Sequence, residues 1–446
     1  MMRFGPLSRN LASLAWPIFI DTLLMMFLGA VDTFMLSRYS DLSVAAVGID
    51  AQFINLVLVI FQVLSLATSI LCSQYIGARL RDKVVQVVGI SLIATAVVGV
   101  LVSSSLFLFA HQILQMLGAG PELIGEAEVY MKIVGLTCIF QAFSLTLAAA
   151  LRSADMAKYP MMVSLIINIV NIFGNYTLIF GHFGFPALGV TGAAIATATS
   201  RGIGMVVLAV ILLRKHIPSF PRRLFSPFPW DELGKLLKVG IPSAGEQMSY
   251  SLSQMVVTSF ILILGNEALA ARTYCQNIVM FTYVIALAMA QASAIEVGHL
   301  VGMKKPRAAF CIGKRALKIS IWSSTSLSFL IACLGLPILH TLTDNENIVR
   351  MCWSVMWVDI MLEHGRAINM FAVNALRSAG DIYFPVLLSI AVVWTVAVGL
   401  SYVFGITLGF GIVGMWFALL LDENIRGYVF VKRWNSMKWA TKSFVR

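Results

Sequence analysis

Charged side chains are scarce in this 446-residue chain. Asp, Glu, Lys and Arg supply only 12% of its residues, about half of their share in an ordinary soluble domain. Hydrophobic residues supply 59%, and the mean hydropathy is +0.87. This composition argues against a soluble enzyme and predicts a membrane protein.

The sequence also lacks the short motifs of catalysis and metal binding. Its six cysteines form no CxxC pair and have no histidines at zinc-ligand spacing, so we expect neither a disulfide framework nor a metal site. No GxxxxGK(S/T) or HExxH motif occurs. Gly409, Gly411 and Gly414 match GxGxxG, but they join two apolar runs without a βαβ context. We therefore predict that the protein is not an enzyme and has no catalytic residues, no ATP-driven step and no cofactor.

Long apolar runs are what the chain has instead. Twelve runs are long enough to cross a bilayer, which takes about 20 residues of helix. They predict an all-α, polytopic membrane protein that contacts the lipid bilayer. The predicted spans are residues 11–36, 44–75, 86–111, 133–151, 160–181, 190–213, 240–264, 268–301, 316–341, 349–376, 384–408 and 411–431.

The net charge of +11 comes from basic residues that are concentrated in alternate connections. Arg3 and Arg9 precede the first span, and Arg79, Arg81 and Lys83 follow the second. Because basic connections stay in the cytoplasm, we expect both termini to be cytoplasmic and the protein to lie in the plasma (inner) membrane. The charge then reports topology, and we expect no nucleic-acid partner. The first run is too long for a signal peptide, so we expect it to be retained.

An internal repeat relates the two halves of the chain. When the sequence is aligned with itself in one register, Leu151-Arg152-Ser153-Ala154 meets Leu376-Arg377-Ser378-Ala379, and Asp21 meets Glu246. With six spans each, both halves enter the membrane from the same side, which predicts two six-helix bundles related by a pseudo-two-fold axis along the membrane normal. The predicted organisation is an N-terminal bundle, a cytoplasmic linker and a C-terminal bundle, at residues 1–215, 216–238 and 239–446.

Several segments of the sequence are similar to one transporter family. They are Leu14-Ala15-Trp16-Pro17-Ile18, Gly29-Ala30-Val31-Asp32-Thr33, Ala150-Leu151-Arg152-Ser153-Ala154, Gly189-Val190-Thr191-Gly192-Ala193 and Ala375-Leu376-Arg377-Ser378-Ala379. In this order, with twelve spans and a half-chain repeat, they resemble the multidrug and toxic compound extrusion (MATE) transporters, in their prokaryotic branch. The resemblance implies two six-helix bundles that export drugs by alternating access.

Polar residues in the first and fifth spans are the candidates for ion coupling. An ionisable side chain at mid-membrane costs about 2.5–3.5 kcal/mol on insertion scales, so it needs a reason to be there. Asp32 follows Asp21 by about three helical turns, so both acids face the same way about 16 Å apart. Asn168, Asn171 and Asn175 form a polar stripe on an apolar helix. Asp32 and these three amides suit a proton or a small cation.

This polar set belongs to the N-terminal half alone. In the register of the repeat, Asp32 aligns with Val257 and Asn175 with Leu400. Helix packing by amides is the alternative explanation, but it gives no reason for one half to hold the whole set. The resemblance implies a coupling role for Asp32. It also places Asn175 where several relatives have a second acid.

A second set of residues is a candidate for substrate binding or for a second polar site. In the tenth span Asp359, Glu363 and Arg366 share a helical face, where an internal ion pair explains them as well as a transport role does. Sulfur and aromatic side chains could line an adaptable cavity for flat amphipathic ligands. The full set is Asp21, Glu246, Glu296, Asp359, Glu363, Arg366, Met25, Met26, Met35 and Phe281.

We predict secondary active efflux of amphipathic organic, mostly cationic compounds in exchange for protons. We expect a monomer whose small-molecule substrates enter a central cleft that opens alternately to either side. Sodium-coupled efflux stays open as an alternative, although Arg366 stands where sodium-coupled relatives resembling this chain have an acid. A flippase for lipid-linked oligosaccharides is the other alternative, but more spans and a basic cleft are typical of such proteins.

Overall fold

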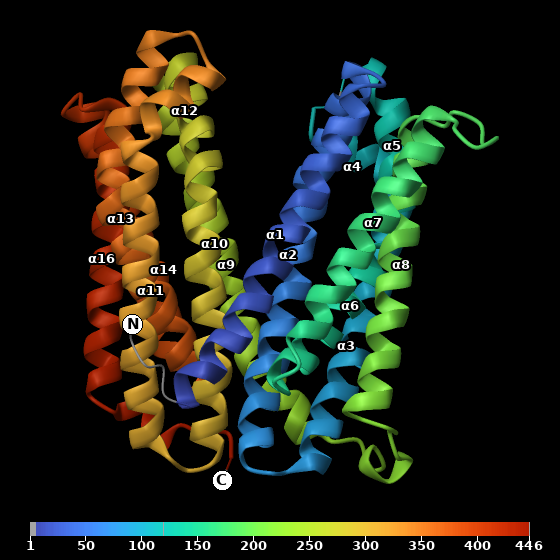
Figure 1. Ribbon diagram of the computed structural model, residues 1–446, viewed down its shortest axis with the longest axis vertical. Coiled ribbons are helices and arrows are strands. Elements are labelled where there is room, and N and C mark those ends of the chain that lie inside the picture. Colours follow the sequence, from blue (N-terminus) through green and yellow to red (C-terminus); the bar gives the residue numbers. More distant parts are fainter. Residues whose placement is uncertain (1–5, 119, 446) are drawn as a thin grey trace. The chain divides into compact units, whose positions relative to one another are not determined.

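The chain is almost entirely helical across residues 6–118 and 120–445, which are the residues described by a computed structural model (Figure 1). No strand occurs in these two ranges. They contain twelve long helical segments in two bundles of six, which confirms the predicted fold class. Arg3, one of the residues behind the predicted topology, lies outside the described ranges.

The first six spans lie between Pro6 and Lys215. The fourth span consists of two helices, α5 and α6, which only Thr137 separates, and a short helix, α4, precedes it. The helices are α1 (Pro6–Ser37), α2 (Asp41–Gly77), α3 (Arg81–Leu108), α4 (Ala110–Met116), α5 (Pro121–Leu136), α6 (Cys138–Ser153), α7 (Lys158–Phe180) and α8 (Val190–Lys215).

The other six spans follow a connection that contains one short 3-10 turn, η1 (Arg222–Leu224). The eleventh span is not a regular α-helix, because two stretches of π-helix interrupt it. The elements are α9 (Trp230–Ile263), α10 (Asn266–Gly302), α11 (Pro306–Cys333), α12 (Gly335–Leu342), α13 (Glu346–Ser378), α14 (Tyr383–Val392), η2 (Val393–Val398), α15 (Gly399–Tyr402), η3 (Val403–Thr407), α16 (Gly411–Asn435) and η4 (Lys438–Thr441).

By contact, the helices group into two compact units. One unit is Ile20–Gly240, and the other combines Met1–Phe19 with Ile241–Arg446. The sequence suggested an N-terminal bundle that ends at residue 215 and a C-terminal bundle that begins at residue 239. In the structure, the start of α1 groups with the C-terminal unit, and the connection between the halves groups with the N-terminal unit. α1 contributes to both units, and Pro17 lies inside this helix just before the change.

Nine helices among the described residues are long and apolar enough to cross a membrane by composition alone. The three long helices that fall short of this measure are α9, α13 and α16. α13 and α16 carry buried charged side chains in their middle turns, for example Asp359 and Arg426. Charge inside a span is expensive, so these helices are where a structural or functional reason for polarity is needed.

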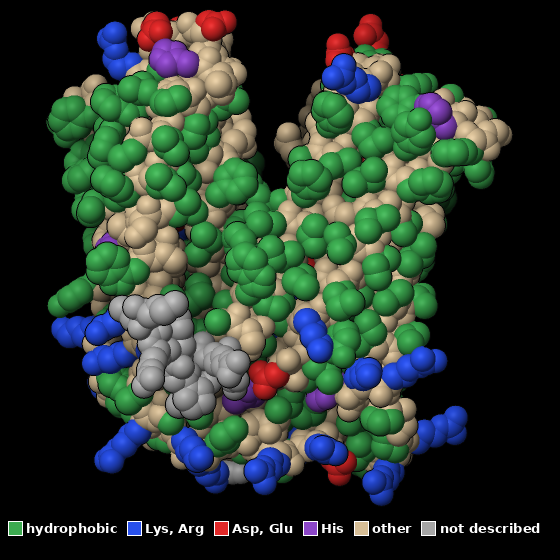
Figure 2. All heavy atoms as spheres, viewed as in Figure 1, with side chains coloured by type: hydrophobic (Ala, Val, Ile, Leu, Met, Phe, Trp, Pro, Cys, Tyr) green, Lys and Arg blue, Asp and Glu red, His purple; other side chains and the backbone are tan. Residues whose placement is uncertain are grey.

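Charge and apolar surface are separated within each unit. Hydrophobic side chains cover the flanks, whereas most of the visible Lys and Arg side chains gather toward the helix ends at the lower edge of Figure 2. Leu101 and Trp322 are 64% and 74% exposed, as expected of side chains that face lipid. Arg79, in the turn between α2 and α3, and Arg81, the first residue of α3, are exposed. This distribution fits a multi-pass membrane protein.

Small residues bring α7 and α8 into close contact. A Cβ atom on Gly192 would lie 2.5 Å from the carbonyl oxygen of Leu178, and one on Gly204 would lie 2.4 Å from Cδ1 of Ile167. The backbone of Leu178 cannot give way easily, so Gly192 requires glycine for this packing, whereas a side chain at position 204 would force the Ile167 side chain to move. The two helices can therefore share polar side chains across their interface.

The connection between the halves is attached to the N-terminal unit by Glu232. This carboxylate is 1% exposed and accepts hydrogen bonds from Tyr75 Oη at 2.6 Å, Lys83 Nζ at 2.9 Å and Lys235 Nζ at 3.0 Å. Burial works against the charged form, but these donors outweigh it and lower the pKa of Glu232. The first turn of α9 is thereby held against the α2–α3 turn.

Candidate functional site

α1 and α7 meet along a line of polar contacts. At one end, Asp21 accepts a hydrogen bond from Ser164 at 2.5 Å, and further along, Asn168 donates to the carbonyl oxygen of Leu24 at 3.1 Å. At the other end, Asn175 Nδ2 donates to Asp32 Oδ1 at 2.5 Å. The two acids are therefore spaced along α1 in the same way as their partners are spaced along α7.

The contact with Asp32 continues into a buried amide network. Asn175 Nδ2 also donates to Asn171 Oδ1 at 3.1 Å, and Asn171 Nδ2 donates to Thr197 Oγ1 on α8 at 3.2 Å. Asn171 and Asn175 are fully buried, whereas Asp32 is partly exposed. The side-chain oxygen of Asn175 is buried and has no hydrogen-bond partner within residues 6–118 and 120–445. The site thus combines one carboxyl group with a spare acceptor oxygen, which suits a proton or a cation.

Asn168 belongs to the same stripe but does not reach Asp32. Its Nδ2 donates to two backbone carbonyls, those of Leu24 and Ser164, and its Oδ1 is buried without a partner. The structure therefore joins Asp32 directly to Asn175 and through it to Asn171. It leaves Asn168 about two turns away along α7.

Two further residues beside this network had no place in the sequence prediction. Arg201 follows Thr197 by one turn of α8, and its charge acts on Asp32, although these two described residues form no direct ion pair. The Nε and Nη1 atoms of Arg201 are buried, and their N–H groups have no hydrogen-bond partner among the described residues. Tyr130 on α5 is 7% exposed and lies beside Thr197, within range of the charge of Asp32. An arginine in the middle of an apolar span is itself a signal that could have identified the first of them.

Asp21 and Glu246 occupy equivalent places in the two units and both pair with arginine. Arg152 Nη2 lies 2.9 Å from Asp21 Oδ2, and Arg377 pairs with Glu246. Each pair joins residues 131 positions apart in the sequence. The internal repeat thus places equivalent ion pairs in the two units. Each ion pair joins two helices of its own unit.

The C-terminal unit buries a cluster of six ionisable side chains on α13 and α16. The six are Asp359, Glu363, Arg366, Asp422, Glu423 and Arg426. Arg366 pairs with Glu363 and lies 3.7 Å from Glu423. Arg426 pairs with Asp422 and lies 3.2 Å from Glu423. The predicted face of the tenth span is therefore completed by residues of the twelfth, which sequence reasoning had not included.

The charges of this cluster do not balance. Four carboxyl groups face two guanidinium groups, so full ionisation would bury two excess negative charges. Trp416 donates to Asp359 Oδ1 at 3.0 Å, but Oδ2 of Asp359 and Oε2 of Glu363 have no hydrogen-bond partner in the described part of the chain. Because uncompensated buried charge is costly, we infer that protons neutralise two of the four carboxyl groups, and that Asp359, which pairs with no arginine among the described residues, is one of them.

The remaining predicted residues are spread over both units. Glu296 is buried on α10, at 6% exposure. Met25 and Met26 are half-buried, and Met35 packs against the core around Leu36. Phe281 on α10 is 55% exposed.

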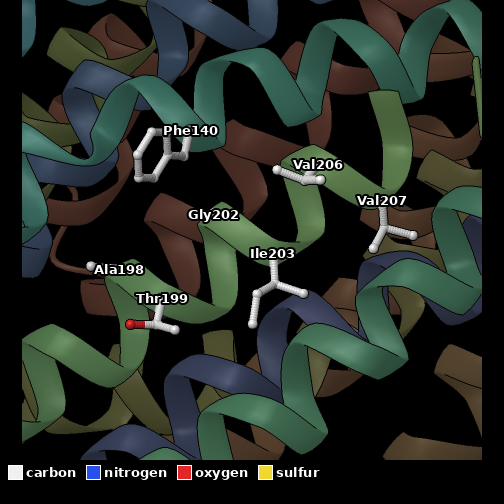
Figure 3. A pocket seen from close by; sticks show the side chains of 7 residues that line it. All are labelled: Phe140, Ala198, Thr199, Gly202, Ile203, Val206 and Val207. Atoms are coloured by element: carbon white, nitrogen blue, oxygen red, sulfur yellow. The ribbon is translucent and has the colours of Figure 1, made fainter. Parts of the chain in front are cut away.

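A shallow apolar groove of about 430 Å³ lies between α6 and α8. Figure 3 shows Phe140 reaching toward it from α6, opposite side chains of α8. Its lining is Phe140, Ala198, Thr199, Gly202, Ile203, Val206 and Val207. None of the predicted site residues lines this groove, and its lining carries no charge, so it has no part in ion binding.

Two repeated six-helix units, with acids, amides and arginines buried among apolar spans, define a multi-pass membrane transporter. The comparison with known families agrees with this class. The MatE family profile matches residues 17–177 and 242–403, two segments whose first residues, Pro17 and Pro242, coincide in the register of the repeat. The chain belongs to this family, the MATE transporters, as its motifs predicted.

Individual relatives cover nearly the whole chain. "Uncharacterized transporter YisQ" of Bacillus subtilis is 38% identical over 436 residues, which are 97% of this chain and 95% of that one. "Probable multidrug resistance protein NorM" of Thermotoga maritima is 25% identical and covers 98% and 94% of the two chains. A solved structure described as the outward-facing conformation of a multidrug resistance MATE family transporter has a TM-score of 0.88 at 22% identity, with 97% of both chains covered. That likeness concerns the fold.

Proposed function

We propose that the protein is a secondary active multidrug efflux antiporter. It exports amphipathic organic, mostly cationic compounds and takes up protons in exchange, by alternating access. The observation that carries this proposal is the contact of Asp32 with Asn175 at the head of a buried amide network. A carboxyl group there can bind a proton from one side of the membrane and release it to the other when its surroundings rearrange.

The choice of the proton rests on Arg201. A sodium ion held between Asp32 and Thr197 would lie near a fixed guanidinium charge, one helical turn away from Thr197, and would be repelled by it. A proton instead forms an O–H bond with the carboxylate and needs no further ligands. Sodium-coupled relatives that resemble this chain have an acid where Arg366 stands. The arginine therefore disfavours a sodium site of that type in the C-terminal half.

The energy of one proton is sufficient for useful export. For a neutral substrate, one elementary charge that crosses 100 mV releases about 2.3 kcal/mol, which supports roughly a 50-fold gradient. Exchange of a monovalent cation for one proton moves no net charge, so the pH difference alone drives it and supports about a tenfold gradient per pH unit. A partly exposed carboxylate is also attractive to a cationic substrate, so substrate and proton compete for Asp32. This competition couples proton uptake to substrate release.

The cellular setting follows from the charges at the helix ends. With the α2–α3 turn and its arginines in the cytoplasm, both termini lie on the cytoplasmic side of the plasma membrane. The relatives that are named as probable multidrug resistance proteins support organic small molecules as the substrate class. We propose that one chain suffices, because each bundle holds its own polar site.

The proposal is tested by efflux of a fluorescent cationic dye from proteoliposomes of the full chain. A pH gradient and a sodium gradient are imposed separately, at zero membrane potential. We expect dye export with the pH gradient alone. If the sodium gradient alone drives export, the coupling ion is sodium and the proposed proton coupling is wrong. Movement of a lipid-linked oligosaccharide, with no dye export under either gradient, would favour a flippase.

A further inference from the structure

α2 contains a buried acid that the proposed function does not use. Asp50 lies in the N-terminal part of this helix, among apolar neighbours, and is 0% exposed. Neither Oδ1 nor Oδ2 has a hydrogen-bond partner among the residues that the structure describes. The residue was hidden in the sequence, because the run around it is otherwise so apolar that one acid does not change its classification.

The surroundings of Asp50 are the seam between α2 and α5. Its neighbours one turn before and after, Ala46 and Ile54, are buried in clusters that include side chains of α5. Two turns before Asp50, Ser43 donates to Glu126 of α5 at 2.7 Å. Polar groups therefore follow this seam from the end of the helices inward.

The charged and titratable groups near this seam are few, and each is accounted for. On α5, Glu126 accepts from Ser43, and Tyr130 lies close enough to both Asp32 and Asp50 for their charges to act on its hydroxyl group. Glu128 of α5 holds both nearby cations, His111 of α4 at 2.8 Å and Lys132 of α5 at 2.6 Å. On α8, the charge of Arg201 acts on Asp32. Among the described residues, Asp50 has neither a hydrogen-bond donor nor an ion-pair partner, so no positive group compensates a charge on it.

An ionised Asp50 would have neither a donor nor a counter-ion in this place. The charged form is therefore excluded here, and the side chain carries a proton. Even the neutral acid leaves a buried polar group without partners, which costs about 1–3 kcal/mol compared with an apolar residue. No hydrogen bond among the described residues of the unit offsets this cost. A structural role therefore does not explain why the residue is an acid.

We propose that Asp50 is a second proton-binding residue of the transport cycle, protonated in this conformation and ionised in another that brings it a donor or water. The proposal rests on the proposed function and extends it from one proton to two. In the step itself, the O–H bond of the Asp50 carboxyl breaks, its electron pair stays on the carboxylate, and the proton passes to water. Tyr130, which lies within range of both acids, links the two sites electrostatically.

The experiment measures how steep a substrate gradient a given pH gradient can hold. Proteoliposomes with zero membrane potential and one pH unit across the membrane are loaded with dye, and the limiting dye ratio is recorded. Two protons per dye hold about a 100-fold ratio, and one proton holds about a tenfold ratio. We expect the first value for the wild type and the second for Asp50→Asn. Asp82→Asn, which removes an exposed acid, is the matched control and should keep the wild-type ratio.

Each result decides the matter. A wild-type ratio in Asp50→Asn would overturn the proposal and leave the proposed function standing, because the acid would then stay neutral throughout the cycle. Failure of the wild type to hold any ratio would remove the proposed function, and this proposal with it. If Asp50→Asn does not fold, Asp50→Leu takes its place. Leu suits the apolar seam, so this variant should be at least as stable as the wild type, and the same tenfold loss is expected.

Discussion

Arg152 on α6 donates a hydrogen bond to Asp21 on α1 at 2.9 Å, and Ser164 on α7 occupies the other oxygen of the same carboxylate. Three helices of one unit are thus joined at a single buried acid. The matching pair of Arg377 and Glu246 in the other unit has the same sequence separation. Asp21 and Glu246, two of the residues that the sequence offered for a substrate site or a second polar site, are here the centres of interhelical ion pairs.

Asp21→Ala should therefore destabilise the N-terminal unit. Removing one partner of a buried ion pair typically costs about 3–5 kcal/mol, because the other charge is left without compensation. We expect a lower thermal denaturation midpoint in detergent for Asp21→Ala and for Arg152→Leu. The double variant should lose less than the two single losses together. Strictly additive losses would mean that the two side chains do not stabilise each other.

Asp32→Asn should keep the fold and stop proton-driven export. The amide has nearly the shape of the acid but cannot release a proton, so dye export under a pH gradient should fall to the rate of empty liposomes. Asp41→Asn, an exposed acid at the start of α2, is the control and should export normally. Normal pH-driven export by Asp32→Asn would remove this residue from ion coupling.

More of the fold than of the candidate site could be predicted from the sequence. Twelve spans and their repeat follow from apolar run length and from motifs such as Leu151-Arg152 and Leu376-Arg377, which are local properties of the chain. The contact between Asp32 and Asn175 joins residues 143 positions apart, and helical periodicity predicts only which face each one occupies. Which helix face contacts which neighbouring helix depends on tertiary packing. The close approach of α7 and α8 at Gly192 is one example.

Most of the site residues that the sequence analysis missed are single polar residues inside very apolar runs. Asp50 and Arg201 lie inside α2 and α8, where average hydropathy conceals them. The partners of Arg366 were missed for a different reason. Glu423 lies on another helix, α16, and only the tertiary structure brings it within 3.7 Å. The π-helical stretches of the eleventh span left no sequence signal that we can identify.

Arg201→Gln should weaken the discrimination against sodium. Without the guanidinium charge, a sodium ion near Asp32 is no longer repelled, and relief of about 1.4 kcal/mol would raise sodium affinity about tenfold. We expect dye export driven by a sodium gradient to appear in this variant, with tighter sodium binding by calorimetry. Arg201→Lys retains the positive charge and should resemble the wild type. Equal sodium responses in both variants would show that the charge does not set ion choice.

Glu232→Gln should remove a pH-dependent part of the stability. The pKa of Glu232 is lower in the folded protein than its ordinary value of 4.5, so its contribution is present above that value and is lost as the pH falls through the folded pKa. At pH 7 the variant should melt at a lower temperature than the wild type, and the difference should shrink in acid, below about pH 4.5. A difference that is independent of pH would contradict a charged Glu232.

The buried cluster of the C-terminal unit allows a prediction from charge balance. Asp359 is inferred to be neutral already, so Asp359→Asn changes no charge and should cost less than about 1 kcal/mol of unfolding free energy. Glu423 accepts from Asn369 at 2.6 Å and lies between two arginines, so Glu423→Gln should cost about 3–5 kcal/mol. Thermal denaturation of both variants at pH 7 checks the contrast. Similar losses in the two would mean that Asp359 is ionised and that the excess negative charge is balanced by some other cation.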